Sequence, residues 1–221
     1  MTLVFLRNWG SALRQLGAAP RIASALCAAL VALAMLQPAQ AQMFSDGYQF
    51  LKAVKDRDGD TATDMLNQPG TQIVNTRDIS TGETGLHVVT NRRDTLWVRF
   101  LLQKGADPNV RDNNGTTALQ IATRLGFIEG VEELVKGGAE VNVSDASGET
   151  PLMSAVHQRN IDLVRRLLAE GADPDLNDNS GRSARDYMEL MNQNTLLARE
   201  FAAADEAREG SPGGEQYGPS F

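Results

Sequence analysis

The sequence predicts an all-α solenoid of about five helix-turn-helix repeats joined by projecting β-turns, which we call fingers. One observation behind this prediction is a mid-chain segment, GADPNVRDNNGTTAL at residues 105–119, which returns as GAEVNVSDASGETPL at residues 138–152. A second is that turn glycines and apolar residues recur with the same 33-residue shift. Self-similarity at such a period indicates an array in which each unit buries its apolar face only against its neighbours.

Two glycine ladders and two apolar ladders share one phase. The glycines of the first ladder lie in the turns and those of the second follow a helical segment, while the apolar residues lie within that segment. The four ladders are Gly82, Gly115, Gly148 and Gly181; Gly105, Gly138 and Gly171; Val98, Val131 and Val164; and Leu101, Leu134 and Leu167. Their agreement fixes the register of the repeat.

Each part of the unit has a local reason to form. A hydroxyl residue at each helix start can accept a backbone N–H, and Pro151 follows one of them at a position where its missing donor costs nothing. These residues are Thr84, Thr117, Thr150 and Ser183. The next helix, as in WVRFLLQK, ends at the second glycine ladder, where a left-handed residue closes a helix. Asn, Asp and Gly then favour a turn.

At these residues the sequence resembles the ankyrin repeat family, whose fingerprint is a Thr-Pro-Leu-His start and a Gly-Ala-Asp-x-Asn exit. Matching segments are TGLHVV and GADPN, TALQIA and GAEVN, and TPLMSA and GADPD. The resemblance covers about Gln42 to Arg208 and implies an ankyrin repeat domain over residues 42–207. Its repeats are expected at about 45–78, 79–111, 112–144, 145–177 and 178–207.

The two terminal repeats depart from the fingerprint. Repeat 1 lacks the Thr-Pro start, and its exit, GTQIVNTRDISTG, carries about two extra residues, which predicts a longer first finger. Repeat 5 has lost the apolar residue at Arg185. Such departures are expected of end caps, which present a polar face to water.

Residues 1–41 have the features of a cleavable signal peptide. They contain three arginines and no acidic residue, and an apolar run covers residues 22–36. Ala39 and Ala41 form a small-x-small site that predicts cleavage before Gln42. The run is shorter than the roughly 20 residues that span a bilayer. An organellar transit peptide and an uncleaved membrane anchor are the alternatives, and the first does not account for the apolar run.

Composition agrees with a periplasmic or secreted protein. Cys27 is the only cysteine and lies in the leader, so the mature chain has no thiol to oxidise. Removing the leader's three arginines from 21 basic residues leaves 18 against 28 acidic ones, a formal charge of −10. We therefore expect no nucleic-acid partner and no membrane insertion after signal removal. We expect a monomer, with a flexible tail at residues 208–221.

No motif in the sequence predicts catalysis, a cofactor or a metal site. The acidic stretches from Asp56 and Asp173 lack the glycine and the glutamate of a calcium loop and are expected to form a helix corner and a finger. His87 occupies the Thr-x-Leu-His position, where the resemblance implies a histidine that hydrogen-bonds the turn. His157 has no second ligand in phase for zinc. We find no nucleophile elbow, phosphate loop or Cys-His pair.

The resemblance implies that a protein partner binds the concave side, along the fingers and the ends of the first helices. The finger positions are Thr81, Glu83, Asn114, Thr116, Ser147 and Glu149. The helix-end positions are Asn91, Arg92, Arg124, Leu125, His157 and Gln158. Of these, Arg92, Arg124 and Leu125 are expected to carry most of the binding energy and not to pack between repeats.

These observations favour an exported protein-binding module that acts as an inhibitor, an assembly factor or a chaperone of another envelope protein. Two alternatives remain at this point. One is an enzyme or metal-dependent protein with an unrecognised site, which a deep pocket with a perturbed carboxylate would favour. The other is a structural spacer in an envelope assembly.

We predict that the mature chain begins at Gln42, within a residue or two, and lies outside the cytoplasm. The three arginines, the apolar run and the Ala-Gln-Ala segment motivate this prediction. N-terminal sequencing and the intact mass of the native protein test it. A soluble cytoplasmic chain that keeps Met1 would contradict it.

Overall fold

The computed structural model describes residues 37–191 and 195–209. The chain divides into two compact units, residues 1–46 and 47–221, and the described part of the second unit holds the repeats. Apart from residues 37–41, the predicted signal peptide lies outside the described residues. The same is true of the predicted tail apart from residues 208–209, which form the end of the last helix.

The described residues form ten α-helices and one short 3-10 helix, with no β-strand among them. In chain order these are α3 (Gln37–Asp56), α4 (Gly59–Leu66), η2 (Ile73–Asn75), α5 (Gly85–Asn91), α6 (Thr95–Gln103), α7 (Ala118–Arg124), α8 (Ile128–Lys136), α9 (Pro151–His157), α10 (Ile161–Ala169), α11 (Ala184–Leu190) and α12 (Thr195–Glu209). Within the described ranges, no helix combines the length and the apolar character needed to cross a membrane.

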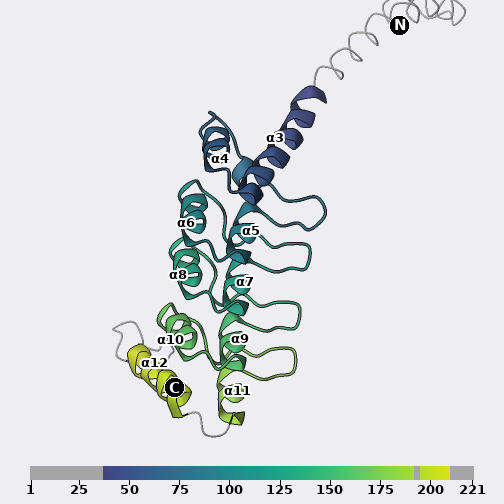
Figure 1. Cartoon of the computed structure of the whole chain (residues 1–221). Helices are drawn as coiled ribbons and strands as arrows, with labels where there is room; N and C mark the ends of the chain where they lie inside the picture. The colour runs from purple at the N-terminus through teal and green to yellow at the C-terminus, as the bar shows by residue number, and fades with distance from the viewer. Residues whose placement is uncertain (1–36, 192–194, 210–221) are drawn as a thin grey trace, which may run out of the picture. The chain divides into compact units, whose positions relative to one another are not determined.

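The helices of the second unit form two layers. Helices α5, α7, α9 and α11 lie side by side in an inner layer, and α6, α8 and α10 lie beside them in an outer layer (Figure 1). Long loops, the predicted fingers, project from the inner layer on the side away from the outer helices (Figure 1). The predicted all-α solenoid of five helix pairs is confirmed.

Each inner helix begins with the expected hydroxyl residue. The side chains of Thr117, Thr150 and Ser183 accept the backbone N–H of the third helical residue. That third residue returns the bond, because its own side chain accepts the N–H of the hydroxyl residue. Four different side chains do this in the four inner helices: His87, Gln120, Met153 and Asp186. The reciprocal bonds satisfy donors that every helix start leaves free.

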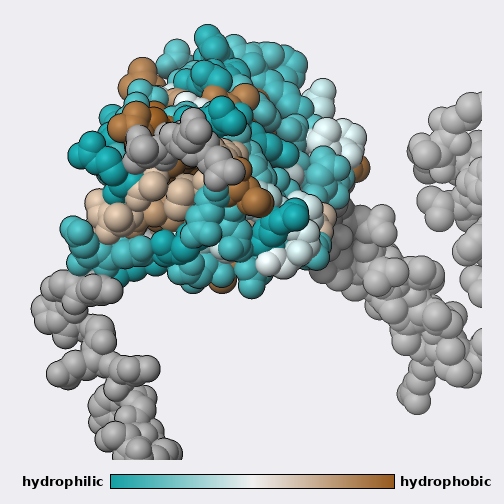
Figure 2. All heavy atoms as spheres, turned by 90° about the horizontal axis from the view of Figure 1, so that it is seen from below, coloured by the Kyte–Doolittle hydropathy of each residue, from teal (hydrophilic) through white to brown (hydrophobic). Residues whose placement is uncertain are grey.

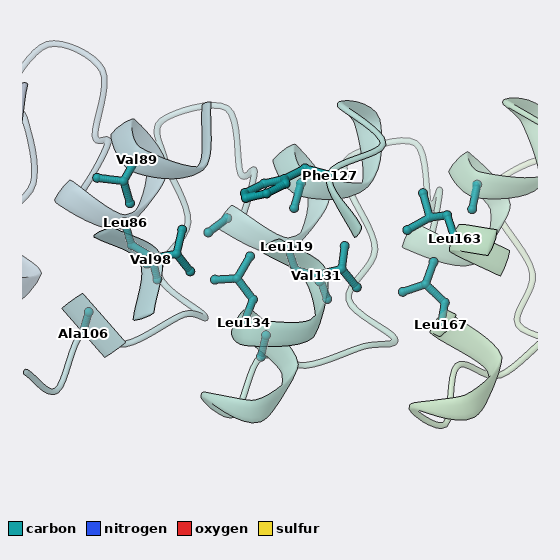
Figure 3. Packing of buried hydrophobic residues seen from close by; sticks show 14 of the residues in the cluster. Leu86, Val89, Val98, Ala106, Leu119, Phe127, Val131, Leu134, Leu163 and Leu167 are labelled. Atoms are coloured by element: carbon teal, nitrogen blue, oxygen red, sulfur yellow. The ribbon is translucent and has the colours of Figure 1, made fainter. Parts of the chain in front are cut away.

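The two predicted apolar ladders form the core. Val98, Val131, Leu101 and Leu134 have no exposed surface, and the same holds for their counterparts in repeat 4. Buried residues run without interruption from Phe50 in α3 to Phe201 in α12. Figure 3 shows the labelled side chains of the middle repeats pointing into the space between helices. Each repeat therefore buries its apolar face against the next one.

One asparagine at the exit of each of the first three repeats bridges to the following repeat. The amide oxygens of Asn75, Asn109 and Asn142 accept the N–H groups of Asp107, Glu140 and Asp173, each at 2.8 Å. Their amide nitrogens donate to the carbonyls of the glycines that end the next outer helices. The asparagine of the Gly-Ala-Asp-x-Asn exit thus acts as a link between repeats.

Two kinds of left-handed residue close the helices. The glycines after the outer helices have the predicted positive φ, between 86° and 92°. The corners between inner and outer helices also contain residues with positive φ, which the sequence analysis did not identify. In three repeats these are arginines, Arg57, Arg93 and Arg159, with φ of 60°, 55° and 54°, whereas repeat 3 has Gly126. Among the residues that the structure describes, only these corners place L side chains in that region.

Ion pairs hold the last helix, α12, against α10 and α11 at the C-terminal end of the array. Arg185, which replaces an apolar residue, is half-buried over the ring of Phe201 and pairs with Asp205 through two hydrogen bonds of 2.9 and 3.0 Å. Arg165 of α10 makes a similar bidentate pair with Glu200 of α12. Seen from below, this end of the molecule has a mostly hydrophilic surface with separate hydrophobic patches (Figure 2).

His87 hydrogen-bonds the turn, as the resemblance implies, and it also reaches the next repeat. Its Nδ1 accepts the Thr84 N–H at 3.1 Å, so its Nε2 carries the proton and lies 3.0 Å from the carbonyl oxygen of Thr116 in the next finger. The side chain is 1% exposed. Burial lowers the pKa of His87 below its ordinary value of 6.5, so the folded protein holds this imidazole neutral.

This lowered pKa predicts that part of the stability is lost in mild acid. Below pH 6.5 the unfolded chain binds a proton at His87 that the folded chain does not, so stability is full above that pH and falls as the pH decreases. At most, the free energy of unfolding falls by about 1.4 kcal/mol for each unit by which the pH decreases. Urea denaturation of the wild type between about pH 7.5 and pH 5.5 measures it.

The control for this prediction is His87→Gln. Gln120 shows that glutamine accepts the same helix-start N–H one repeat later, at 3.0 Å. The variant should therefore fold but lose less stability on acidification than the wild type. His157 is present in both proteins, so a difference between their pH profiles belongs to position 87. Parallel profiles would contradict the prediction.

Candidate protein-binding surface

Each finger is closed by an aspartate at its base. The Oδ1 atoms of Asp78, Asp112, Asp145 and Asp178 accept the backbone N–H two residues later, at 2.8 to 2.9 Å. A glycine with positive φ then completes the turn. The Tyr187 hydroxyl and Ser180 lower the pKa of Asp178, and Lys55 and Ser80 lower that of Asp78. The fingers are therefore held in shape by their own backbone and by ionised carboxylates.

The first finger is longer than the others, as predicted. Its base is closed by a hydrogen bond from Asp78 N to Glu83 O, whereas Asp112 N bonds Thr116 O, one residue closer along the chain. Ile79 directly follows Asp78 in this finger, and 89% of its surface is exposed. No other large apolar residue in the described ranges is as exposed.

The predicted finger residues differ in their exposure. Thr81, Asn114 and Ser147 lie in the turns and are exposed. Glu83 and Glu149 are half-buried at the finger bases. Thr116 is 8% exposed, because its carbonyl receives the hydrogen bond from His87. The turns are thus open to a partner, while the bases face the inner helices.

One of the two helix-end columns faces the fingers. Asn91, Arg124 and His157 end α5, α7 and α9, and all three are exposed. Asn91 donates to Glu83 Oε1 at 3.4 Å, and His157 Nδ1 lies 3.3 Å from Glu149 Oε1. We call the surface formed by these three helix ends with Glu83, Thr116 and Glu149 the finger face.

The second helix-end column does not belong to this surface. Arg92 Nη1 donates to Val54 O at 2.5 Å and to Lys55 O at 3.3 Å, and Gln158 Nε2 donates to Thr123 O at 3.1 Å. These acceptors lie at the end of the inner helix of the preceding repeat, where carbonyls lack an intrahelical partner. Leu125, in the same column, packs against the core.

The expectation that Arg92 and Leu125 do not pack between repeats is therefore wrong. Only 17% of the Arg92 side chain is exposed, and its guanidinium lies 5.7 Å from the ring centroid of Trp97. Burial lowers its pKa. The sequence offered a signal that could have separated the columns, because a residue just past a seven-residue helix lies over the previous repeat. Arg124 is exposed, as expected.

A small hollow lies on the finger face between repeats 3 and 4. It has a volume of about 60 Å³ and brings together the predicted residues Thr116, Arg124 and Glu149. Gln120 and Ser154 also line it. Burial raises the pKa of Asp145, another lining residue, but the hydrogen bonds from Ser147 and Glu149 and the charge of Arg124 outweigh this and lower it. The walls thus carry hydrogen-bonding groups and charges of both signs.

Comparison with known families identifies this architecture. A family model described as ankyrin repeats (3 copies) matches residues 50–145, and a second, described as ankyrin repeats (many copies), matches residues 134–188. These residues belong to the ankyrin repeat family. Ankyrin repeat proteins are typically non-enzymatic binding modules, so the matches support a role in protein-protein interaction. No curated protein matches the sequence.

The acidic stretches of this ankyrin protein have structural roles. Asp58 caps α4 by accepting the N–H and the hydroxyl of Thr61, at 3.0 and 2.7 Å, so this stretch is the predicted helix corner. Asp173 and Asp178 belong to the exit and the turn of a finger. No group of three His, Cys, Asp or Glu residues that could hold a metal ion occurs within the part of the chain that the structure describes.

The two helix-end columns of the ankyrin array should respond differently to truncation. Arg92→Ala removes donors to two carbonyls at the end of α3, and bonds to charged groups contribute about 1.5–3 kcal/mol. We expect a loss of that order in the free energy of unfolding. Arg124→Ala should change it by about 0.5 kcal/mol or less, as at most surface sites. Urea denaturation of both variants measures the difference, and equal losses would show that the columns are misassigned.

Proposed function

We propose that this protein is an exported, periplasmic ankyrin-repeat protein that binds another protein through the finger face. In this role it acts as an inhibitor, an assembly factor or a chaperone of an envelope protein. It works as a monomer and without a cofactor. Family membership supports the binding role, and the basic, acid-free leader with its apolar run supports export.

One observation carries the choice of surface. Asn91, Arg124 and His157 end successive inner helices on the side of the fingers. Neither Asn91 nor Arg124 makes a contact that holds two repeats together among the described residues, whereas the ring of His157 lies 4.4 Å from that of Tyr187 in the next repeat. The residues one position later, Arg92 and Gln158, do make contacts between repeats. The finger face can therefore vary in sequence at Asn91 and Arg124 without loss of the fold, which is what a recognition surface needs.

The charge of the array supports a protein partner over a nucleic acid. Without the leader, acidic residues exceed basic ones by ten, and recognition of a phosphate backbone requires a basic face. Arg124 is a cation on the finger face without an ion pair among the described residues. Arginine is enriched among the residues that dominate protein interfaces.

The experiment begins with affinity purification from the native envelope fraction and identification of the bound protein by mass spectrometry. The affinity of that partner is then measured for the triple variant Asn91→Ala, Arg124→Ala, His157→Ala. We expect a loss of at least tenfold, about 1.4 kcal/mol, with an unchanged circular dichroism spectrum.

The matched control truncates exposed residues of the outer layer: Leu96→Ala, Gln103→Ala and Glu129→Ala. These side chains lie on α6 and α8, away from the fingers, so the control should bind normally. If the control loses affinity and the finger-face variant does not, the partner binds the outer layer and the proposed surface is wrong.

A further inference from the structure

Neighbouring fingers are joined by an asparagine, except at one place. Asn113 in the second finger donates its backbone N–H to Thr81 O at 2.9 Å and its amide to Ser80 O at 3.0 Å. Asn179 repeats both bonds between the fourth finger and the third. The third finger has Ala146 at this position, and Ala146 donates no hydrogen bond to the second finger. The joint between repeats 3 and 4 therefore lacks this link.

A second link is missing at the same joint. In repeat 2, His87 Nε2 reaches the carbonyl of Thr116 at the base of the next finger. Gln120 occupies the equivalent position in repeat 3, and its Oε1 accepts the Thr117 N–H. Its Nε2 finds no acceptor among the described residues, although the side chain is only 6% exposed. A buried donor without an acceptor costs stability and is uncommon in folded proteins.

The hollow of the finger face lies at this joint. Its volume of about 60 Å³ exceeds the roughly 10–15 Å³ that a single water needs. Gln120 and Arg124 line it from repeat 3, and Asp145, Glu149 and Ser154 line it from repeat 4. One wall thus supplies an unsatisfied amide donor and an unpaired guanidinium, and the other supplies two carboxylates and a hydroxyl.

We propose that this hollow is the anchor point of the partner protein and takes the primary carboxamide of an asparagine or glutamine side chain. This inference rests on the proposed function. The carbonyl oxygen of the carboxamide accepts from Arg124, and from Gln120 Nε2 once this buried amide turns toward the hollow, and its NH₂ group donates to Glu149. A carboxylate would meet Asp145 and Glu149, and an ammonium group would meet Arg124. Only a neutral group with both a donor and an acceptor satisfies the two walls.

The chain itself suggests how to close the hollow without damaging the fold. Gln120→His should copy His87 and donate to the carbonyl of Glu149, as His87 does to Thr116 one repeat earlier. Ala146→Asn should copy Asn113 and Asn179 and join the third finger to the second. The double variant should be at least as stable as the wild type, because it adds the asparagine link of the other finger joints and the histidine link that joins repeats 2 and 3.

The test uses three small probes on the full ¹⁵N-labelled chain: acetamide, acetate and ethylammonium, at matched concentration and ionic strength. We expect acetamide to shift the NMR signals of the Gln120 side-chain amide, the Arg124 Nε–H and the backbone amides of residues 147–150. Its dissociation constant should be at least about tenfold lower than that of either charged probe. The double variant should lose this response while keeping its melting temperature, and Leu96→Ala, in the outer layer, should keep it.

The proposal is overturned if acetate or ethylammonium binds as tightly as acetamide, if acetamide shifts signals elsewhere, or if no probe is bound. It is also overturned if the stable double variant still responds like the wild type. These outcomes leave the proposed function standing as long as the finger-face triple variant loses the native partner. A triple variant that binds that partner normally would instead remove the proposed function.

Discussion

The inner helices are only seven residues long, and most of the structure follows from that constraint. A helix leaves four N–H groups at its start and four carbonyls at its end without an intrahelical partner, so a helix this short has almost no interior. The hydroxyl residues and the reciprocal third residues satisfy the starts. Side chains of the following repeat, Arg92 and Gln158, satisfy the ends. The helices are therefore completed by their neighbours, which explains why such a unit needs an array to be stable.

The parts of the fold that recur could be predicted from the sequence. The apolar ladders, the helix-start hydroxyls and the glycines after the outer helices each repeat with one period, and each has one local cause. Positions whose residue type changes between repeats were harder to place. The corner residue is arginine at 93 and 159 but glycine at 126. Because no single residue type recurs at this position, the sequence pattern did not predict its left-handed conformation. Arg92 and Arg124 are the same residue type one column apart, and only the geometry of the helix end separates their roles.

The geometry of the helix end also separates the residues that hold repeats together from those that are available for recognition. Residues whose side chains reach the next or the previous repeat, such as Asn109 and Arg92, are bound to their neighbours. Residues one position away, such as Arg124, face the fingers and hold nothing together. Of the predicted finger positions, Asn114 and Ser147 in the turns are exposed, whereas Thr116 at the base is buried and its carbonyl accepts the bond from His87. The position of a residue relative to the end of its inner helix thus decides whether its side chain is available to a partner.

The missing links at Ala146 and Gln120 also bear on how the array unfolds. In a linear array the total stability is approximately a sum of terms for each repeat and for each interface between neighbours, so a weaker interface lowers the coupling between the two sides. The outer helices show the same trend, because α8 packs less extensively against α10 than α6 does against α8. The boundary between α8 and α9 is therefore the place where we expect the coupling along the array to be weakest.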